Sequence, residues 1–205
     1  MTGIVDYGLG NLHSVNNALL YIGEESVISS DKDVLSKCDR LILPGVGAFP
    51  DAMKRLYELD FVDFLRDYSK NRPLLGICLG MQLLFDKSYE GGENEGLGLI
   101  SGEVIKLRAY ESSREYKIPH MGWNSLDIAP DQPLYEGIDQ GRSVYFVHSF
   151  KCVPTDKSDV AASSEYGEQI CASVHRGNVY GCQFHPEKSG QDVGLKILKN
   201  FVSLK

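Results

Sequence analysis

Short apolar runs alternate with helical patterns through the first half of the chain, and no other feature limits the fold as strongly. Four such runs predict buried strands, at residues 4–6, 26–28, 40–43 and 74–77. Apolar side chains at helical spacing follow three of them, at residues 11–22, 53–65 and 78–85. Because parallel strands need a long crossover, usually a helix, this order predicts βαβ units. We expect an α/β fold whose central, mostly parallel sheet is flanked by helices.

The second half has a different pattern, with little helix between its strand-like segments. These segments are residues 97–107, 143–150, 170–175 and 179–184. They predict a partly antiparallel addition to the first sheet. Residues 189–204 predict a closing amphipathic helix. A length of 205 residues is typical of one domain, so we expect residues 1–205 to form a single domain.

The composition narrows the class of protein. Lys and Arg number 21 against 28 Asp and Glu, a net charge of −7 that disfavours nucleic acid or an anionic membrane as the main partner. No apolar run is long enough to span a bilayer, and the first residues lack the pattern of a signal peptide. The five cysteines are odd in number and form no CxxC pair. We therefore expect no disulfide framework, no metal site and a cytoplasmic location.

One glycine-rich turn is similar to a cofactor-binding motif. Gly8-Leu9-Gly10 follows the first predicted strand and precedes a helix, as a dinucleotide-binding fingerprint does. The third glycine of that fingerprint falls at the position of His13. The incomplete match favours an ordinary strand-to-helix turn, and we expect no cofactor.

The segment Gly76-Ile77-Cys78-Leu79-Gly80 places a cysteine between two glycines where a predicted strand meets a predicted helix. This pattern is typical of a nucleophile elbow, in which a sharp turn exposes the nucleophile above the carboxyl end of the sheet. The free N–H groups and the dipole at the start of the helix favour a thiolate there. A buried, unreactive cysteine is the common alternative. We expect that alternative for Cys38, Cys152, Cys171 and Cys182.

A cysteine nucleophile needs a base, and His185 in Gln183-Phe184-His185-Pro186-Glu187 is the best-placed histidine. It ends a strand-like run that Pro186 stops. Glu187 follows two residues later, so in extended backbone both side chains point the same way. The carboxylate would then orient the imidazole, as the third member of a triad does. For this segment alone, a surface turn is the alternative.

Three motifs together resemble the class I glutamine amidotransferases, whose active site is a cysteine-histidine-glutamate triad. They are Gly76-Ile77-Cys78-Leu79-Gly80-Met81-Gln82, Phe184-His185-Pro186-Glu187 and Pro44-Gly45-Val46-Gly47, the last of which looks like the family's oxyanion loop. The motifs occur in the family's order over nearly the whole chain. The resemblance implies the class I glutamine amidotransferase fold and an enzyme that hydrolyses glutamine to glutamate and ammonia.

By this resemblance, Cys78 attacks the side-chain amide of glutamine, His185 transfers the proton to the leaving ammonia, and Glu187 orients His185. The backbone N–H groups of Val46 and Leu79 are the expected oxyanion donors. The glycines on either side of Val46 would let the loop flip a peptide plane.

The residues expected to contact glutamine also follow from the resemblance. They are Gly45, Gly47, Gln82, His148, Ser149 and Phe150. Phe150 stands where relatives often have tyrosine, so a contact through a hydroxyl would be lost and one through the main chain would not. Sequence pattern alone favours an exposed helix residue for Gln82 and a core histidine for His148.

Two further segments are similar to one branch of the family, in which the glutaminase is a separate subunit. They are Asp6-Tyr7-Gly8-Leu9-Gly10-Asn11 and Pro119-His120-Met121-Gly122-Trp123-Asn124. The similarity implies a heterodimer with a (β/α)8-barrel cyclase, which receives the ammonia through a channel shielded from water. Asn11, Met121 and Trp123 are candidates for the docking face, because Met and aromatic side chains are enriched in interfaces. A core position is the alternative for Trp123.

Other functions stay open on the sequence alone. The glutaminase could supply ammonia to a different synthase, such as one that amidates a sugar, or the chain could be an inactive binding module on the same fold. The complete set of Cys78, His185 and Glu187 argues against the inactive module. A related cysteine hydrolase would usually place its histidine next to the elbow, where this chain has Met81 and Gln82.

Overall fold

A mixed sheet forms the centre of the computed structural model, which describes residues 1–108, 110–111 and 114–204, with backbone only for 110–111 and 114–115. Within these residues its eight strands are β1 (Thr2–Val5), β2 (Ser26–Ser29), β3 (Arg40–Gly45), β4 (Leu74–Cys78), β11 (Asp127–Ile128), β14 (Val160–Glu165), β15 (Gln169–Arg176) and β16 (Val179–Cys182). They run in the order β11-β14-β15-β16-β4-β3-β1-β2. The five strands from β16 to β2 pair in parallel, and β15, β14 and β11 extend the sheet with antiparallel pairs.

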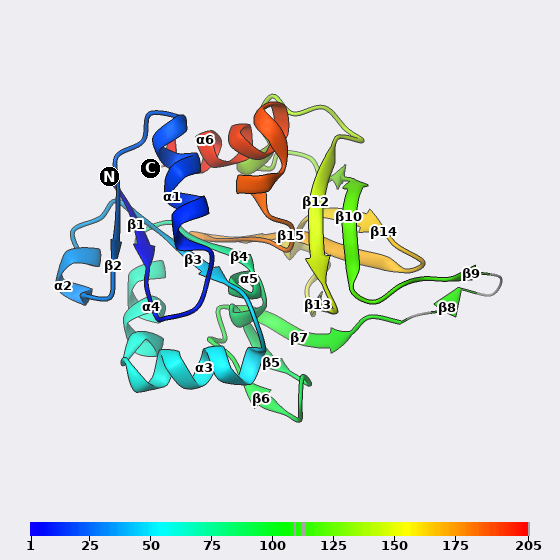
Figure 1. The fold of residues 1–205 in the computed structure, drawn as a ribbon, viewed down its shortest axis with the longest axis horizontal. Coiled ribbons are helices and arrows are strands. Elements are labelled where there is room, and N and C mark those ends of the chain that lie inside the picture. Colours follow the sequence, from blue (N-terminus) through cyan, green and yellow to red (C-terminus); the bar gives the residue numbers. More distant parts are fainter. Residues whose placement is uncertain (109, 112–113, 205) are drawn as a thin grey trace.

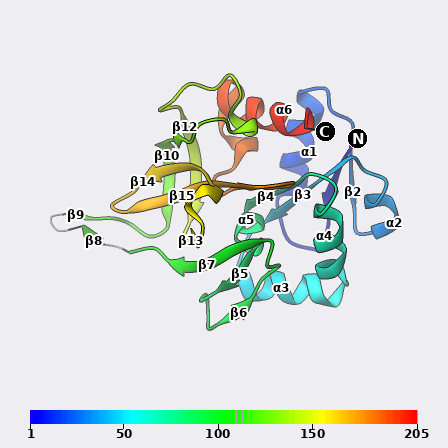
Figure 2. The same cartoon turned by 180° about the vertical axis from the view of Figure 1, so that it is seen from behind.

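Helices cover both faces of this sheet, as Figure 1 and Figure 2 show. They are α1 (Leu12–Tyr21), α2 (Lys32–Leu35), α3 (Phe49–Glu58), α4 (Phe61–Ser69), α5 (Leu79–Leu83) and α6 (Lys196–Val202). Side chains of a strand point alternately to its two faces. In β3, Ile42 joins the core under α1 and α6, while Leu41 and Leu43 join the core under α3 and α4. These two cores confirm the predicted α/β fold.

The second half adds smaller sheets beside the central one (Figure 1). Their strands are β5 (Phe85–Ser88), β6 (Asn94–Glu95), β7 (Ile100–Lys106), β8 (Tyr110–Glu111), β9 (Arg114–Glu115), β10 (His120–Ser125), β12 (Ser143–His148) and β13 (Phe150–Pro154). One sheet has the order β13-β7-β5-β6, and β10 pairs with β12 in antiparallel register. The partly antiparallel addition is therefore also confirmed. The short helical turns are η1 (Pro133–Tyr135), η2 (Lys157–Asp159), η3 (Pro186–Lys188) and the π-helical η4 (Gly190–Leu195).

Several predicted boundaries are wrong for local reasons. The helical pattern at residues 53–65 belongs to two helices, because Asp60 takes a left-handed φ of 54° between them. The helix after Cys78 ends at Leu83 rather than near residue 85, where β5 begins. Strand β3 continues through Pro44, whose carbonyl accepts the Tyr7 hydroxyl at 3.0 Å. The closing helix starts as the π-helical η4 before α6.

Candidate active site

Cys78 lies on a sharp turn between β4 and α5. Its φ of 56° and ψ of −112° lie in a region that residues other than glycine rarely occupy. A Cβ atom on Gly80 would lie 1.8 Å from the Leu43 carbonyl oxygen, so only glycine lets α5 approach β3 this closely. The tight packing of helix on sheet therefore holds the cysteine in a strained conformation that directs its thiol into a pocket.

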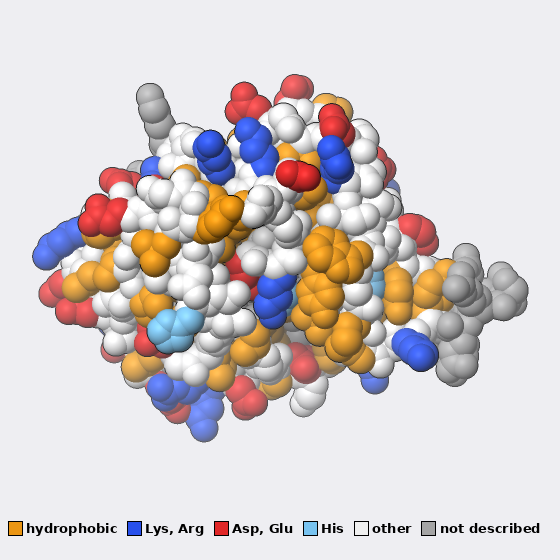
Figure 3. All heavy atoms as spheres, turned by 45° about the horizontal axis from the view of Figure 1, so that its top comes forward, with side chains coloured by type: hydrophobic (Ala, Val, Ile, Leu, Met, Phe, Trp, Pro, Cys, Tyr) orange, Lys and Arg blue, Asp and Glu red, His pale blue; other side chains and the backbone are white. Residues whose placement is uncertain are grey.

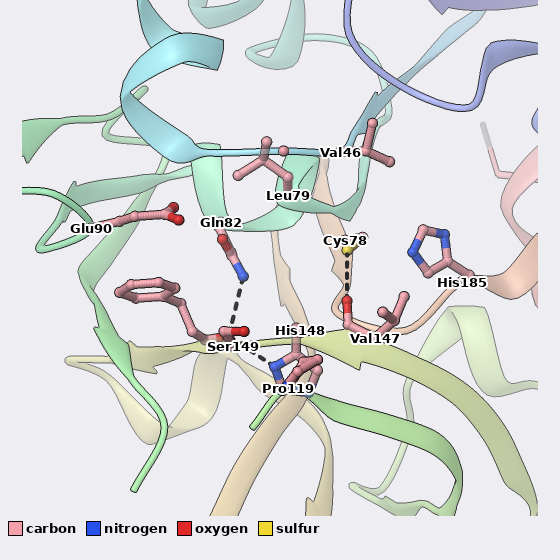
Figure 4. Close-up of a pocket in the computed structure, with 12 residues that line it drawn as sticks. Val46, Cys78, Leu79, Gln82, Glu90, Pro119, Val147, His148, Ser149 and His185 are labelled. Carbon is pink, nitrogen blue, oxygen red and sulfur yellow. Dashed lines mark hydrogen bonds between the residues drawn. The ribbon is translucent and has the colours of Figure 1, made fainter. Parts of the chain in front are cut away.

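The structure brings His185 and Glu187 to this thiol. His185 follows β16 in extended backbone, and its Nδ1 lies 2.8 Å from Glu187 Oε1. Cys78 lies beside the ring in Figure 4. Burial alone would lower the pKa of His185, but the contacts with Cys78 and Glu187 raise it to about 9. The imidazolium is therefore the stable form of His185 at neutral pH.

Glu187 carries the negative charge that balances the His185 cation. Its side chain is 1% exposed, and Oε1 is the oxygen that faces His185. The other oxygen, Oε2, makes no hydrogen bond with the residues that the structure describes. A buried carboxylate needs a cation beside it to stay ionised, so the imidazolium and the carboxylate stabilise each other.

The thiol opens into a cavity of about 340 Å³, which has the size of a small-molecule site. Figure 4 shows how the side chains converge on it. The lining residues are Val46, Gly47, Cys78, Leu79, Gln82, Glu90, Pro119, Val147, His148, Ser149, Phe150 and His185.

Most of the residues expected to contact glutamine line this cavity, and two of them, Gln82 and His148, hydrogen-bond to one main-chain oxygen. Gln82 is buried rather than exposed, and its Nε2 donates to the Phe150 carbonyl oxygen at 3.2 Å. His148 Nδ1 lies 2.8 Å from the same oxygen, a contact that makes Nδ1 the protonated nitrogen. Ser149 also lines the cavity. The main-chain carbonyl of Phe150 thus orients both side chains.

His148 differs from His185 in its charge. Its Nε2 faces Nδ1 of His120 at 3.0 Å, and both rings are buried. Burial lowers the pKa of His148 to about 4, against the opposing effect of the Phe150 carbonyl and with help from the charge on His185. Burial and His148 lower the pKa of His120 to about 4 as well. Both imidazoles are neutral at physiological pH.

The predicted oxyanion residues lie at the rim of the same cavity. Leu79 is the first residue of α5, where a helix has N–H groups without partners inside the helix. Val46 is 41% exposed, and Gly47 beside it has a φ of 99°, which only glycine adopts easily. Gly45 is not part of the lining, because it pairs with Cys78 as the last residue of β3.

The residues expected at the docking face are on the surface. Met121 and Trp123 are 60% and 59% exposed on one face of β10, so the core alternative for Trp123 is wrong. Trp123 packs edge-on against Tyr145 of β12 at 6.0 Å, and Figure 3 shows hydrophobic side chains gathered over this strand pair. Asn11 is exposed at the start of α1 and its side chain does not cap the helix.

Sequence reasoning missed three side chains near the thiol. Glu90 lines the cavity from the loop after β5, and its Oε2 accepts the Phe49 N–H at 2.8 Å. Gln183 lies next to Cys78, and His120 holds His148. Gln183 and His120 each lie within a sequence motif, at residues 183–187 and 119–124, which is the only signal for them. The position of Glu90 depends on how the loop folds back.

The other four cysteines are free and buried. Burial raises the pKa of Cys171 and of Cys182 to about 12, and that of Cys38 and Cys152 also rises. Across the described part of the chain, no three His, Cys, Asp or Glu side chains group as a metal site. In the same residues, no helix is long and apolar enough to cross a membrane.

Comparison with known proteins identifies the class. The family model described as "Glutamine amidotransferase class-I" matches residues 3–204, and the chain belongs to this family. The protein named "Imidazole glycerol phosphate synthase subunit HisH" of Syntrophotalea carbinolica is 50% identical over 98% of both chains. That of Geobacillus kaustophilus is 52% identical over 100% of this chain and 97% of its own. The solved structure of PurLQS from Thermotoga maritima shares the fold, with a TM-score of 0.74 and 22% identity over 98% of this chain and 96% of the other.

Proposed function

We propose that the chain is the glutaminase subunit of an imidazole glycerol phosphate synthase in histidine biosynthesis. Its full-length identity of 50–52% to relatives of that name supports the assignment. The observation that carries the chemistry is the row of thiol, imidazole and carboxylate at the wall of a substrate-sized cavity. A glutaminase that serves another synthase is the second candidate, because such an enzyme would have the same three catalytic groups.

The reaction proceeds in two halves. His185 holds the proton that Cys78 has given up, and the thiolate attacks the carboxamide carbon of glutamine. His185 returns the proton to the nitrogen as the C–N bond breaks, which releases ammonia and leaves a thioester. Water then attacks the thioester with His185 as the base, and glutamate leaves as the sulfur regains a proton. Glu187 keeps His185 in one tautomer and stabilises its cation throughout.

Each tetrahedral intermediate carries a negative oxygen that needs donors. The Leu79 N–H at the start of α5 supplies one of them. The Val46 N–H supplies the second when the loop around Gly47 presents it. Since a missing donor costs about 10²–10³ in rate, docking of a partner against this loop can switch the enzyme on.

The cavity also has acceptors for the α-ammonium group of free glutamine. Both hydrogens of Gln82 Nε2 are engaged, by Phe150 and by Gln183, so Gln82 presents its oxygen to the cavity. The Glu90 carboxylate points toward Gln82 in Figure 4. Together they favour free glutamine over a glutamine inside a peptide, which lacks the ammonium group.

The partner in this proposal is a (β/α)8-barrel cyclase, bound as a heterodimer in the cytoplasm. Residues 1–205 act as one amidotransferase domain, and the cyclase uses the ammonia to form imidazole glycerol phosphate and AICAR. Met121, Trp123 and Asn11 form the exposed docking face. Water would protonate released ammonia at neutral pH, so tight docking serves to pass it on as the free base.

The substitution Cys78→Ala tests this function. Because the nucleophile is lost, glutamine-dependent synthesis by the complex should fall by at least about 10⁴-fold. Synthesis supplied with ammonium salt should continue, since the cyclase site is intact. The two activities are measured on the co-purified complex. Loss of both with assembly unchanged would contradict the ammonia-donor role, and failure to bind the histidine-pathway cyclase would favour another synthase.

A further inference from the structure

Gln183 is a wholly buried amide next to the nucleophile, with an exposed fraction of 0%. Strands β16 and β4 are parallel neighbours, and Cys182, the last residue of β16, pairs with Ile77. Gln183 therefore stands beside Cys78 at the next position along the two strands. Its Nε2 lies 4.0 Å from Cys78 Sγ.

A main-chain carbonyl oxygen, that of Phe150, fixes the orientation of two side-chain amides. They belong to Gln82 and Gln183, and Gln183 contacts the Cys78 sulfur. The Phe150 oxygen can only accept, so Gln82 must turn its Nε2 toward it. The same Nε2 donates to Gln183 Oε1 at 3.1 Å. Gln183 then has its NH2 group left for Cys78. Reversing either amide would place two acceptors or two donors against each other.

The sulfur needs a donor once it has lost its proton. As a thiol, Cys78 donates to the Val147 carbonyl oxygen at 3.8 Å. As a thiolate it can only accept, and the Val147 oxygen then no longer stabilises it. The Gln183 N–H suits the charged form, because hydrogen bonds to an ion are stronger than those between neutral groups. Hydrogen bonds of catalytic groups are often long in the free enzyme and shorten during the reaction.

We propose that Gln183 is a positioning residue of the nucleophile: its side-chain N–H donates to the Cys78 thiolate while its oxygen holds Gln82. The inference rests on the proposed role of Cys78 in glutamine hydrolysis. It makes one buried amide the link between the attacking sulfur and the residue that receives the substrate. A structural role limited to holding Gln82 is the competing explanation.

Alkylation of Cys78 separates these explanations, because it needs no glutamine. The full-length chain is treated with iodoacetamide across a pH series, and the Cys78 peptide is followed by mass spectrometry, with Cys78→Ala as the blank. Gln183→Met keeps the volume and loses the donor. The pH midpoint of alkylation should rise by about one unit, so alkylation below the midpoint should slow about tenfold, with a matching fall in kcat for glutamine.

Gln82→Met is the matched control, because it removes the contact that orients Gln183 and keeps the Gln183 N–H itself. It should raise KM for glutamine and shift the midpoint clearly less than Gln183→Met does. Gln183→Glu keeps the length and the acceptor, and its carboxylate beside the sulfur should raise the midpoint at least as far. Because this charge effect arises under either explanation, Gln183→Asn, which keeps the amide and draws it back from the sulfur by one methylene, decides the question if thermal melts show that Gln183→Met does not fold. Its midpoint should rise if the native N–H donates to the thiolate.

An unchanged midpoint in a folded Gln183 variant overturns the inference, and so does an equal shift in Gln82→Met. Glutamine hydrolysis by the wild-type complex is measured in parallel. If the wild type hydrolyses no glutamine, the proposed function fails whatever the alkylation profile shows.

Discussion

His185 and His148 face the same cavity and are almost equally buried, with exposed fractions of 3% and 5%. They nevertheless differ in charge, because His185 is a cation at neutral pH and His148 is neutral. The pKa of His185 rises to about 9, and that of His148 falls to about 4. In both, burial opposes the cation. Burial therefore does not decide the charge of a histidine in this site.

Their partners decide it. His185 lies between Cys78, which favours the cation as a thiolate, and the Glu187 carboxylate, which favours it as well. His148 lies between a carbonyl oxygen and the ring of His120, and the charge on His185 repels a second proton. In the proposed function, Cys78, His185 and Glu187 form the reactive side of the site. Gln82, His148, Ser149 and Phe150 form its recognition side and are uncharged.

Removing the carboxylate should remove part of this difference. Glu187→Gln keeps the shape and takes away one of the two groups that raise the pKa of His185, the other being Cys78, so that pKa should fall toward that of His148. The kcat for glutamine should drop by roughly 10³–10⁴-fold, because the imidazole loses both its orientation and its counterion. NMR titration of the imidazole and glutamate release measure the two effects. A Glu187→Asp variant serves as the conservative control and should recover part of kcat.

The sequence predicted the reactive side far better than the recognition side. Cys78 followed from a glycine-flanked strand end, and the His185–Glu187 pair followed from a spacing of two in extended backbone, which is local geometry. The parallel sheet followed from the same kind of local pattern. No local pattern brings Glu90 back across the cavity, because its position depends on how the loop after β5 folds. None sets His120 against His148 either, because that contact depends on the register between β10 and β12. The exposed helix position that pattern alone favours for Gln82 is wrong, because its partners Phe150 and Gln183 are distant in the sequence.

A change on the recognition side should act on binding rather than on chemistry. His148→Phe keeps a ring in the wall but loses the N–H that holds the Phe150 carbonyl. One lost hydrogen bond corresponds to roughly a 5- to 10-fold change, so KM for glutamine should rise by about that factor while kcat stays nearly constant. Steady-state kinetics of the complex give both constants. His148→Asn should restore much of KM, since its amide N–H can reach the same oxygen; a fall confined to kcat would assign His148 to the reactive side.

The smallest effect should appear in the pH dependence of stability. His120 stacks between Tyr166 and Phe146, with ring centroids 3.9 and 4.6 Å away, so His120→Phe preserves the stack and removes a titrating group. Between its folded pKa of about 4 and an unfolded value of about 6.5, the unfolded chain binds more protons. The wild type therefore loses stability as pH falls through this range. His185 acts in the opposite sense, because its raised pKa removes stability as pH rises from about 6.5 through 9, but this contribution is the same in both proteins.

Urea unfolding of wild type and His120→Phe at several pH values between 4 and 8 measures the difference. Relative to the wild type, the variant should become more stable as pH falls below about 6.5, by less than about 1 kcal/mol per pH unit because solvent screens part of the ideal value. Above pH 6.5 the two curves should run parallel. Parallel curves at all pH values would mean that the pKa of His120 in the fold equals its unfolded value, which would contradict a lowered pKa for this ring.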